Sequence, residues 1–323
     1  MKTQLRLRLA KILVINIGAV GTEVVKNLVL GGVNLIELLD LSVIKDADFG
    51  CQFFLPNDSL VEGQLKLPVI LPQIKELNNR VNVTINTSTL ASIEPEYYGQ
   101  FDLVIATELT YAEIVAVNNL TRTHRIPLYV SGMHGMFGYI FTDLIKQTSE
   151  ATRVLGNVPR LPGTALNPKK TITEVDVDKA ANKEHLTIVD EYNPLVDAFN
   201  LKELPNQLRK RQLKQLGGAV PMIFALLHYD RPTDPDAMPD KAQLAADATE
   251  KCRDLGLPEL LVDATYTSMF SRQAFTEFAP VAAIIGGALA QDVIQFFGQK
   301  ELRINNALIF DGHKQSMPIF TLY

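Results

Sequence analysis

The fold is decided by the stretch AKILVINIGAVGTEVVKNLVLGG, residues 10–32. Residues 10–17 form a short run rich in β-branched side chains, which predicts a strand that ends at Gly18. A helix follows, because valine and leucine recur at helical spacing between residues 24 and 29. Gly31-Gly32 then stops that helix.

The corner between this strand and this helix is Asn16-Ile17-Gly18-Ala19-Val20-Gly21. It stands where a G-x-G-x-x-G fingerprint places a phosphate on a helix N-terminus. Asn16 replaces the first glycine, and asparagine tolerates the left-handed backbone angles of a tight turn. Asp40 follows about 20 residues after Gly21, where an acid can hold a ribose hydroxyl. The pattern predicts a nucleotide-type pocket with Gly18, Gly21 and Asp40, or else close strand–helix packing alone.

Strand and helix patterns alternate over the rest of the N-terminal part. Residues 66–78 predict a helix that is short or kinked, because Pro68 and Pro72 disrupt a helix unless each lies in a first turn. The alternation favours a Rossmann-like α/β fold, with a mostly parallel sheet covered on both faces. The further apolar runs that predict strands are residues 35–39, 81–85, 101–106, 128–131 and 137–144.

The middle of the chain has a different composition. Residues 147–192 carry Pro159, Pro162 and Pro168, a threonine-rich stretch and little apolar periodicity. This composition favours a linker or a mobile loop. Helix-like patterns follow, and they predict a helical insertion over 195–227 and 242–255.

The α/β pattern returns after residue 275. A helix is expected from Pro280 to about Phe297, and strands over 307–310 and 318–322. The C-terminus thus completes the first domain. The predicted parts are the N-terminal part of the Rossmann-like domain (1–146), a linker and helical insertion (147–275) and the C-terminal completion (276–323).

Composition excludes several classes of protein. The net charge of −5 leaves no global positive field to hold nucleic acid. The longest apolar stretch, 278–290, is too short to span a bilayer, so no membrane partner is expected. Cys51 and Cys252 are too few for a four-thiolate zinc site or a disulfide framework. They suit a reducing compartment, so the nucleus or the cytosol is the expected location.

Several further stretches carry a resemblance to a known family. Together with residues 10–33, they resemble the ubiquitin-like modifier activating enzymes over about 200 residues at both ends of the chain. The overall length, the short insertion and the run 106–109 are most similar to the smaller, regulatory subunits of SUMO-activating heterodimers. The stretches are DLSVI (40–44), SGMHGMFGYIF (131–141), FAPVAAIIGG (278–287), AQD (290–292) and FDG (310–312).

The resemblance also implies which site residues are present and which are absent. Asp40 matches the ribose acid, Gln52 the glutamine of an Asn-Arg-Gln-Phe segment, and Lys66 the phosphate lysine. Gly50-Cys51 replaces the Asn-Arg pair, so a guanidinium is absent. Leu109 stands where the magnesium aspartate is expected.

Glu108 is adjacent to Leu109 and is expected to point elsewhere. The resemblance therefore implies a degenerate pocket of Gly18, Gly21, Asp40 and Lys66, with no catalytic residue and no metal ligand in this chain. It implies that no cofactor binds this chain alone.

The resemblance implies two partners, a catalytic subunit and SUMO. The catalytic subunit would supply the ATP and Mg²⁺ site and the thioester cysteine. Cys51 and Cys252 lack a recognisable activating context and are interpreted as non-catalytic. His134, between two glycines, is interpreted as structural. The small-residue helix 281–290 packs either on its own sheet or on the partner.

Two enzyme hypotheses remain as alternatives. A homodimeric adenylating enzyme of the bacterial sulfur-carrier kind is disfavoured by the absent arginine and aspartate. An NAD-dependent dehydrogenase would retain the glycine corner. It leaves the Gly286-Gly287 helix and the long insertion unexplained.

Overall fold

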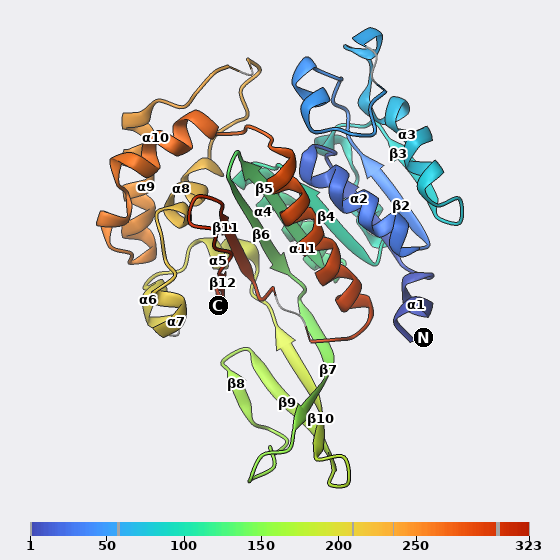
Figure 1. The fold of residues 1–323 in the computed structure, drawn as a ribbon, viewed down its shortest axis with the longest axis vertical. Helices are drawn as coiled ribbons and strands as arrows, with labels where there is room; N and C mark the ends of the chain where they lie inside the picture. The colour runs from blue at the N-terminus through green and yellow to red at the C-terminus, as the bar shows by residue number, and fades with distance from the viewer. Residues whose placement is uncertain (1, 57–58, 209, 235, 302–303, 323) are drawn as a thin grey trace.

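The computed structural model describes all residues except 1, 57–58, 209, 235, 302–303 and 323. Within them, the main sheet consists of β1 (Lys11–Ile15), β2 (Leu35–Leu39), β3 (Asn82–Asn86), β4 (Leu103–Thr107), β5 (Leu128–His134), β6 (Phe137–Asp143), β11 (Ala307–Asp311) and β12 (Ile319–Phe320). The strand order is β12-β11-β6-β5-β4-β1-β2-β3 (Figure 1). Strands β1 to β5 pair parallel, whereas β6, β11 and β12 pair antiparallel. The predicted Rossmann-like, mostly parallel sheet is confirmed.

Helices cover both faces of this sheet. Successive strand residues point to opposite faces, so Ile12 and Val14 of β1 belong to one core and Leu13 and Ile15 to the other. The first core includes the N-terminal helix, α2, α3 and α11, and the second includes α4. Their bounds are α1 (Lys2–Leu7), α2 (Ala19–Gly31), α3 (Lys66–Leu77), α4 (Tyr111–Thr123) and α11 (Ala279–Phe297).

Helix α3 accommodates both of its prolines. Pro68 lies in the first turn, where a missing N–H removes no intrahelical bond. Pro72 lies inside the 12-residue helix. Ile70 and Ile74 are buried beside it, so tertiary packing offsets the cost of the second proline.

The prediction of a linker over 147–192 is wrong. This segment forms a second, antiparallel sheet in the order β7-β10-β9-β8, which projects away from the main body (Figure 1). Its apolar periodicity is hidden because polar side chains, among them Ser149, Glu184 and Asp190, occupy buried positions. The strands are β7 (Lys146–Val154), β8 (Ala165–Asn167), β9 (Lys170–Asp178) and β10 (Lys183–Glu191).

The helical insertion follows this second sheet and packs on the α4 side of the main sheet. Its helices are α5 (Leu195–Phe199), α6 (Leu204–Gln207), α7 (Lys210–Leu213), α8 (Ala219–Leu226), α9 (Lys241–Leu255) and α10 (Ala264–Gln273). Short 3-10 turns lie at Asp46–Gly50, Ser59–Val61, Leu90–Ser92, Pro95–Gln100 and Glu259–Leu261. All residues of α8 are buried, which explains its almost wholly apolar sequence.

Helices α2 and α11 lie side by side and run in the same direction (Figure 1). A Cβ at Gly286 would lie 2.5 Å from Glu23 Cβ and 3.2 Å from the Val20 carbonyl oxygen. Farther along, a Cβ at Gly31 would lie 3.7 Å from Ile294 Cδ1. Glycine at position 286 therefore sets the closest approach of the two helices.

Helix α11 is the described helix that is long and apolar enough, by length and composition, to cross a membrane. Val281, Ile285 and Leu289 recur at helical spacing and are buried in the core with α2 and the sheet. Ala283 and Ile284 face outward and are exposed. Of the two placements that the sequence left open, the structure shows packing on the protein's own sheet. That packing accounts for the apolar composition.

Replacement of Gly286 by alanine should destabilise the fold by about 1–3 kcal/mol, because the new methyl group overlaps Glu23 and the α2 backbone. The matched control is Gly287→Ala, because a Cβ there meets no atom within 4 Å. This control should be neutral or stabilise by up to about 1 kcal/mol through helix propensity. Urea unfolding of both variants measures the difference, and equal midpoints would contradict the close α2–α11 contact.

Candidate functional site

A cavity of about 400 Å³ lies at the carboxyl ends of β1, β2 and β4, beside the start of α2. This is the edge of an α/β sheet where ligands bind. Three of the four predicted site residues, Gly18, Asp40 and Lys66, line the cavity. The other lining residues are Asn16, Ser42, Val43, Lys45, Ala47, Asp48, Glu108, Arg231, Pro232, Ala274, Phe275, Thr276 and Glu277.

The glycine corner has the tight geometry that its sequence predicts. Asn16 adopts a left-handed φ of +61°, and its amide Nδ2 donates to the Thr107 carbonyl oxygen at 3.0 Å. A Cβ at Gly21 would lie 2.6 Å from the Asn16 carbonyl oxygen. Gly21 therefore lies behind the cavity and allows strand and helix to pack closely.

Asp40 and Lys66 both have partners within the chain. The two carboxylate oxygens of Asp40 accept hydrogen bonds from the backbone N–H groups of Ile17 and Ser42, at 2.8 and 2.7 Å. Lys66 Nζ donates to Asp48 Oδ1 at 2.9 Å. Both side chains are buried, so each contact also fixes the wall of the cavity.

Gln52, the third matched position, lies outside the cavity lining. It is buried, and its Nε2 donates to the Ile17 carbonyl oxygen at 2.9 Å. Its Oε1 has no hydrogen-bond partner among the described residues. Gln52 therefore supports the glycine corner from behind.

Glu277, which sequence reasoning missed, occupies the start of α2. Its Oε1 accepts a hydrogen bond from the Ala19 backbone N–H at 2.9 Å. A Cβ at Gly18 would overlap the same oxygen, so glycine at this position leaves room for the carboxylate. A carboxylate of the chain itself thus stands at the helix N-terminus, where the fingerprint places a phosphate. Because the contact spans 258 positions, no local sequence signal reveals it.

The expectation that Glu108 points elsewhere is wrong, because Glu108 lines the cavity. Its backbone has a positive φ of 60°, so the strand ends in a turn there and does not continue its alternation. One carboxylate oxygen accepts from the Met133 N–H at 3.2 Å, and the other pairs with Arg231. Leu109 is instead buried in the core on the α4 side.

The charges around the cavity do not favour a polyphosphate. The lining contains four carboxylates, those of Asp40, Asp48, Glu108 and Glu277, and three cationic side chains. Two of the cations already pair with lining carboxylates, Lys66 with Asp48 and Arg231 with Glu108. The third, Lys45, is exposed. A ligand with several negative charges would meet an excess of like charge.

The environments of the two thiols and of His134 disfavour their charged forms, although a backbone hydrogen bond from Ala279 partly offsets this effect at Cys51. Burial raises the pKa of Cys51, and the nearby Glu277 carboxylate raises it further. Burial raises the pKa of Cys252 to about 11. The ring of His134 is buried, which lowers its pKa to about 3, and its Nδ1 accepts from the Phe275 N–H at 3.0 Å. These environments are those of packing residues.

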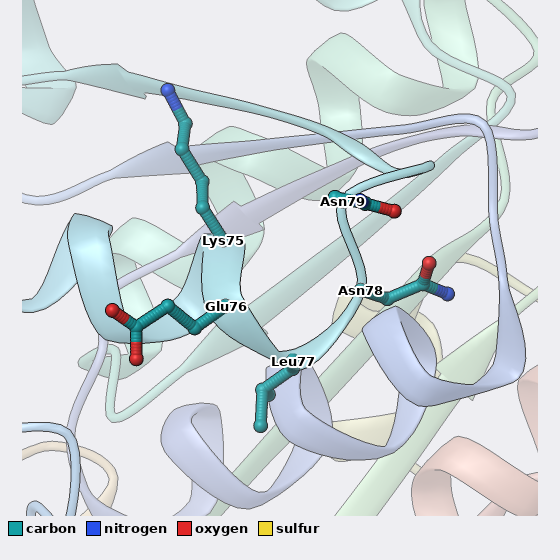
Figure 2. Close-up of a pocket in the computed structure, with 5 residues that line it drawn as sticks. All are labelled: Lys75, Glu76, Leu77, Asn78 and Asn79. Atoms are coloured by element: carbon teal, nitrogen blue, oxygen red, sulfur yellow. The ribbon is translucent and has the colours of Figure 1, made fainter.

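A roomier hollow of about 570 Å³ lies at the C-terminal end of α3, lined by residues 75–79. Figure 2 shows its five side chains spreading in different directions, with Lys75 and Glu76 pointing apart. Asn78 Nδ2 donates to the Val29 carbonyl oxygen at 3.0 Å, at the end of α2. Because its polar groups do not converge, this hollow lacks the features of a binding site.

Known proteins resemble this chain over nearly its whole length. A model of the ThiF family matches residues 1–322. The chain belongs to the ThiF family. It is similar to the DNA damage tolerance protein RHC31 of Saccharomyces cerevisiae, at 36% identity over 99% of this chain and 92% of that protein.

Two further relatives are less similar to this chain. The DNA damage tolerance protein rad31 of Schizosaccharomyces pombe is 28% identical over 99% of this chain and 92% of its own length. The SUMO-activating enzyme subunit 1 of Homo sapiens is 26% identical, over 97% of this chain and 89% of that protein. The resemblance noted from the sequence is thus confirmed at the level of the family.

Both thiols of the native chain should react slowly with iodoacetamide at pH 7.5. With a pKa of about 11, Cys252 holds roughly a hundredfold less thiolate than a free cysteine. Mass spectrometry of timed samples measures the labelling, and urea-unfolded chain serves as the control. Labelling of Cys51 in the native chain as fast as in the unfolded chain would contradict its half-buried, acid-flanked environment.

Proposed function

We propose that this chain is the smaller, non-catalytic subunit of a SUMO-activating heterodimer. The observation that carries the proposal is the cavity, where Glu277 caps α2 and Arg231 pairs with Glu108. Similarity to proteins named SUMO-activating enzyme subunit 1 over nearly the whole chain supports the same role. The chain would support ATP-dependent adenylation and thioester transfer of SUMO that the partner subunit carries out.

The residues present do not fit Mg²⁺ and ATP. Adenylyl transfer needs cations on the phosphates and an acid on magnesium to stabilise developing charge. Gly50 and Cys51 carry no positive charge, and Leu109 is buried away from the cavity. Lys66 is paired with Asp48. We therefore assign the ATP and Mg²⁺ site, together with the thioester cysteine, to the catalytic partner subunit and derive no step in this chain.

In this role the chain would act by binding the catalytic subunit. We take as one candidate contact face the exposed apolar side chains on α11 and on the segments next to the cavity lining. They are Leu41, Val43, Phe53, Phe278 and Ile284. Permanent complexes typically bury about 2,000 Å² or more of largely apolar surface, and this face offers such groups. We assign it to the catalytic subunit, and we expect the complex mainly in the nucleus and also in the cytoplasm.

The alternatives have less support. The match to the ThiF family over residues 1–322 leaves nothing in favour of an NAD-dependent dehydrogenase. A homodimeric adenylating enzyme would need a phosphate site in each copy. In this chain, Glu277 takes that place.

The isolated chain should not catalyse ATP–pyrophosphate exchange when SUMO, Mg²⁺ and ATP are supplied, because its cavity has no free guanidinium for the phosphates. Radiolabelled pyrophosphate incorporation into ATP is the measurement. The reconstituted heterodimer is the positive control. Exchange by the chain alone at a rate comparable to the heterodimer would contradict the non-catalytic assignment.

A glutamate on the outward face of α11 should weaken assembly with the catalytic subunit by at least about tenfold, because an unpaired charge would be buried in the interface. The variant is Ala283→Glu, and the matched control is Ala246→Glu on α9, since both alanines are exposed. Co-purification and titration by fluorescence anisotropy measure the affinity. Circular dichroism establishes that each variant is folded, and equal affinities for the two variants would exclude this face of α11.

A further inference from the structure

The carboxylate of Glu277 is held at the start of α2 by its neighbours on both sides. Residues 274–277 form one wall of the cavity, where the chain returns from the helical insertion to α11. The Phe275 N–H donates to His134 Nδ1 at 3.0 Å, and the Thr276 carbonyl oxygen accepts from the Gly135 N–H at 2.8 Å. The segment is thus fixed to the β5–β6 turn, and Glu277 reaches Ala19 from a restrained backbone.

The contacts of Glu277 are those of a bound anion. Its oxygen accepts from the first N–H of a 13-residue helix and lies over Gly18, whose missing side chain makes room for it. The Glu277 carboxylate also favours the charged form of the Arg231 guanidinium, which lines the same cavity and pairs with Glu108. A helix N-terminus, a glycine and a guanidinium are the groups that proteins use to hold phosphate.

We propose that Glu277 is a tethered substitute for a nucleotide phosphate, which closes this cavity to polyphosphate ligands. A group attached to the chain competes at a high effective concentration, about millimolar or above, without losing translational freedom. Its charge also leaves the cavity with more carboxylates than cations. Gly18 lies directly beneath the carboxylate, and the buried Lys66, which pairs with Asp48, lines the same cavity. The inference rests on the non-catalytic site of the proposed function and deepens it by naming what fills that site.

The test measures binding of pyrophosphate to the full chain by isothermal titration calorimetry in EDTA, so that no metal contributes. Glu277→Ala removes the carboxylate, and Glu277→Gln removes its charge while it keeps an oxygen for the Ala19 N–H. The matched control is Glu96→Gln, because Glu96 is exposed and does not line the cavity. We expect Glu277→Ala to bind roughly tenfold more tightly than the unmodified chain, with a smaller gain for Glu277→Gln and none for the control.

One double variant tests whether the gain in affinity arises in this cavity. Lys66→Met in the Glu277→Ala background should return pyrophosphate affinity to that of the unmodified chain, because Lys66 lines the same cavity. Circular dichroism checks folding, and Glu277→Gln decides the question if Glu277→Ala does not fold. The inference is overturned if the folded Glu277 variants bind no more tightly than the unmodified chain, or if Glu96→Gln gives the same gain. Because the assay needs neither SUMO nor a partner, its outcome is separate from that of the heterodimer assays.

Discussion

The close approach of α11 to α2 at Gly286 is the contact on which the rest of the structure depends. It brings the two ends of the chain together on one face of the sheet, since α2 follows the first strand and α11 lies near the C-terminus. The parallel direction of the two helices also places their N-termini at the same edge. Glu277, two residues before the first residue of α11, can therefore reach the first N–H of α2. The packing of two apolar helices thus places a carboxylate at the edge of the cavity.

The insertion between β6 and α11 also contributes to the wall of this cavity, through Arg231 and Pro232. It leaves the main sheet at Asp143, whose buried carboxylate pairs with Arg122 and accepts from Asn118 Nδ2 at 2.8 Å. After the second sheet and the short helices, it contributes Arg231, which pairs with Glu108 at the end of β4. The insertion therefore has a structural effect on the cavity, because it supplies the cation that balances one of the carboxylates there.

Local patterns in the sequence predicted the fold well where one signal decided the structure. The glycine corner and the parallel strands depend on short-range spacing, and both are confirmed, as is the position of Asp40 beside that corner. The second sheet was missed because its inward positions include buried polar residues such as Glu184, which pairs with Arg160 and breaks the apolar alternation. Glu108 was misplaced because a positive φ ends the strand at that residue. Glu277 was missed because only the tertiary fold brings it to Ala19.

A chain whose own carboxylate bonds the N-terminus of α2 does not need a bound nucleotide to stabilise that helix end. An empty helix N-terminus at the bottom of a cavity leaves backbone N–H groups that need a partner, and a bound anion normally supplies it. Here Glu277 supplies it from within the chain. The carboxylate contributes to the stability of α2 whether or not nucleotide is present, so the shape of the cavity edge does not depend on the ligand. The exposed apolar residues next to that edge, such as Phe278 beside Glu277, are then held in an arrangement that does not change with ligand.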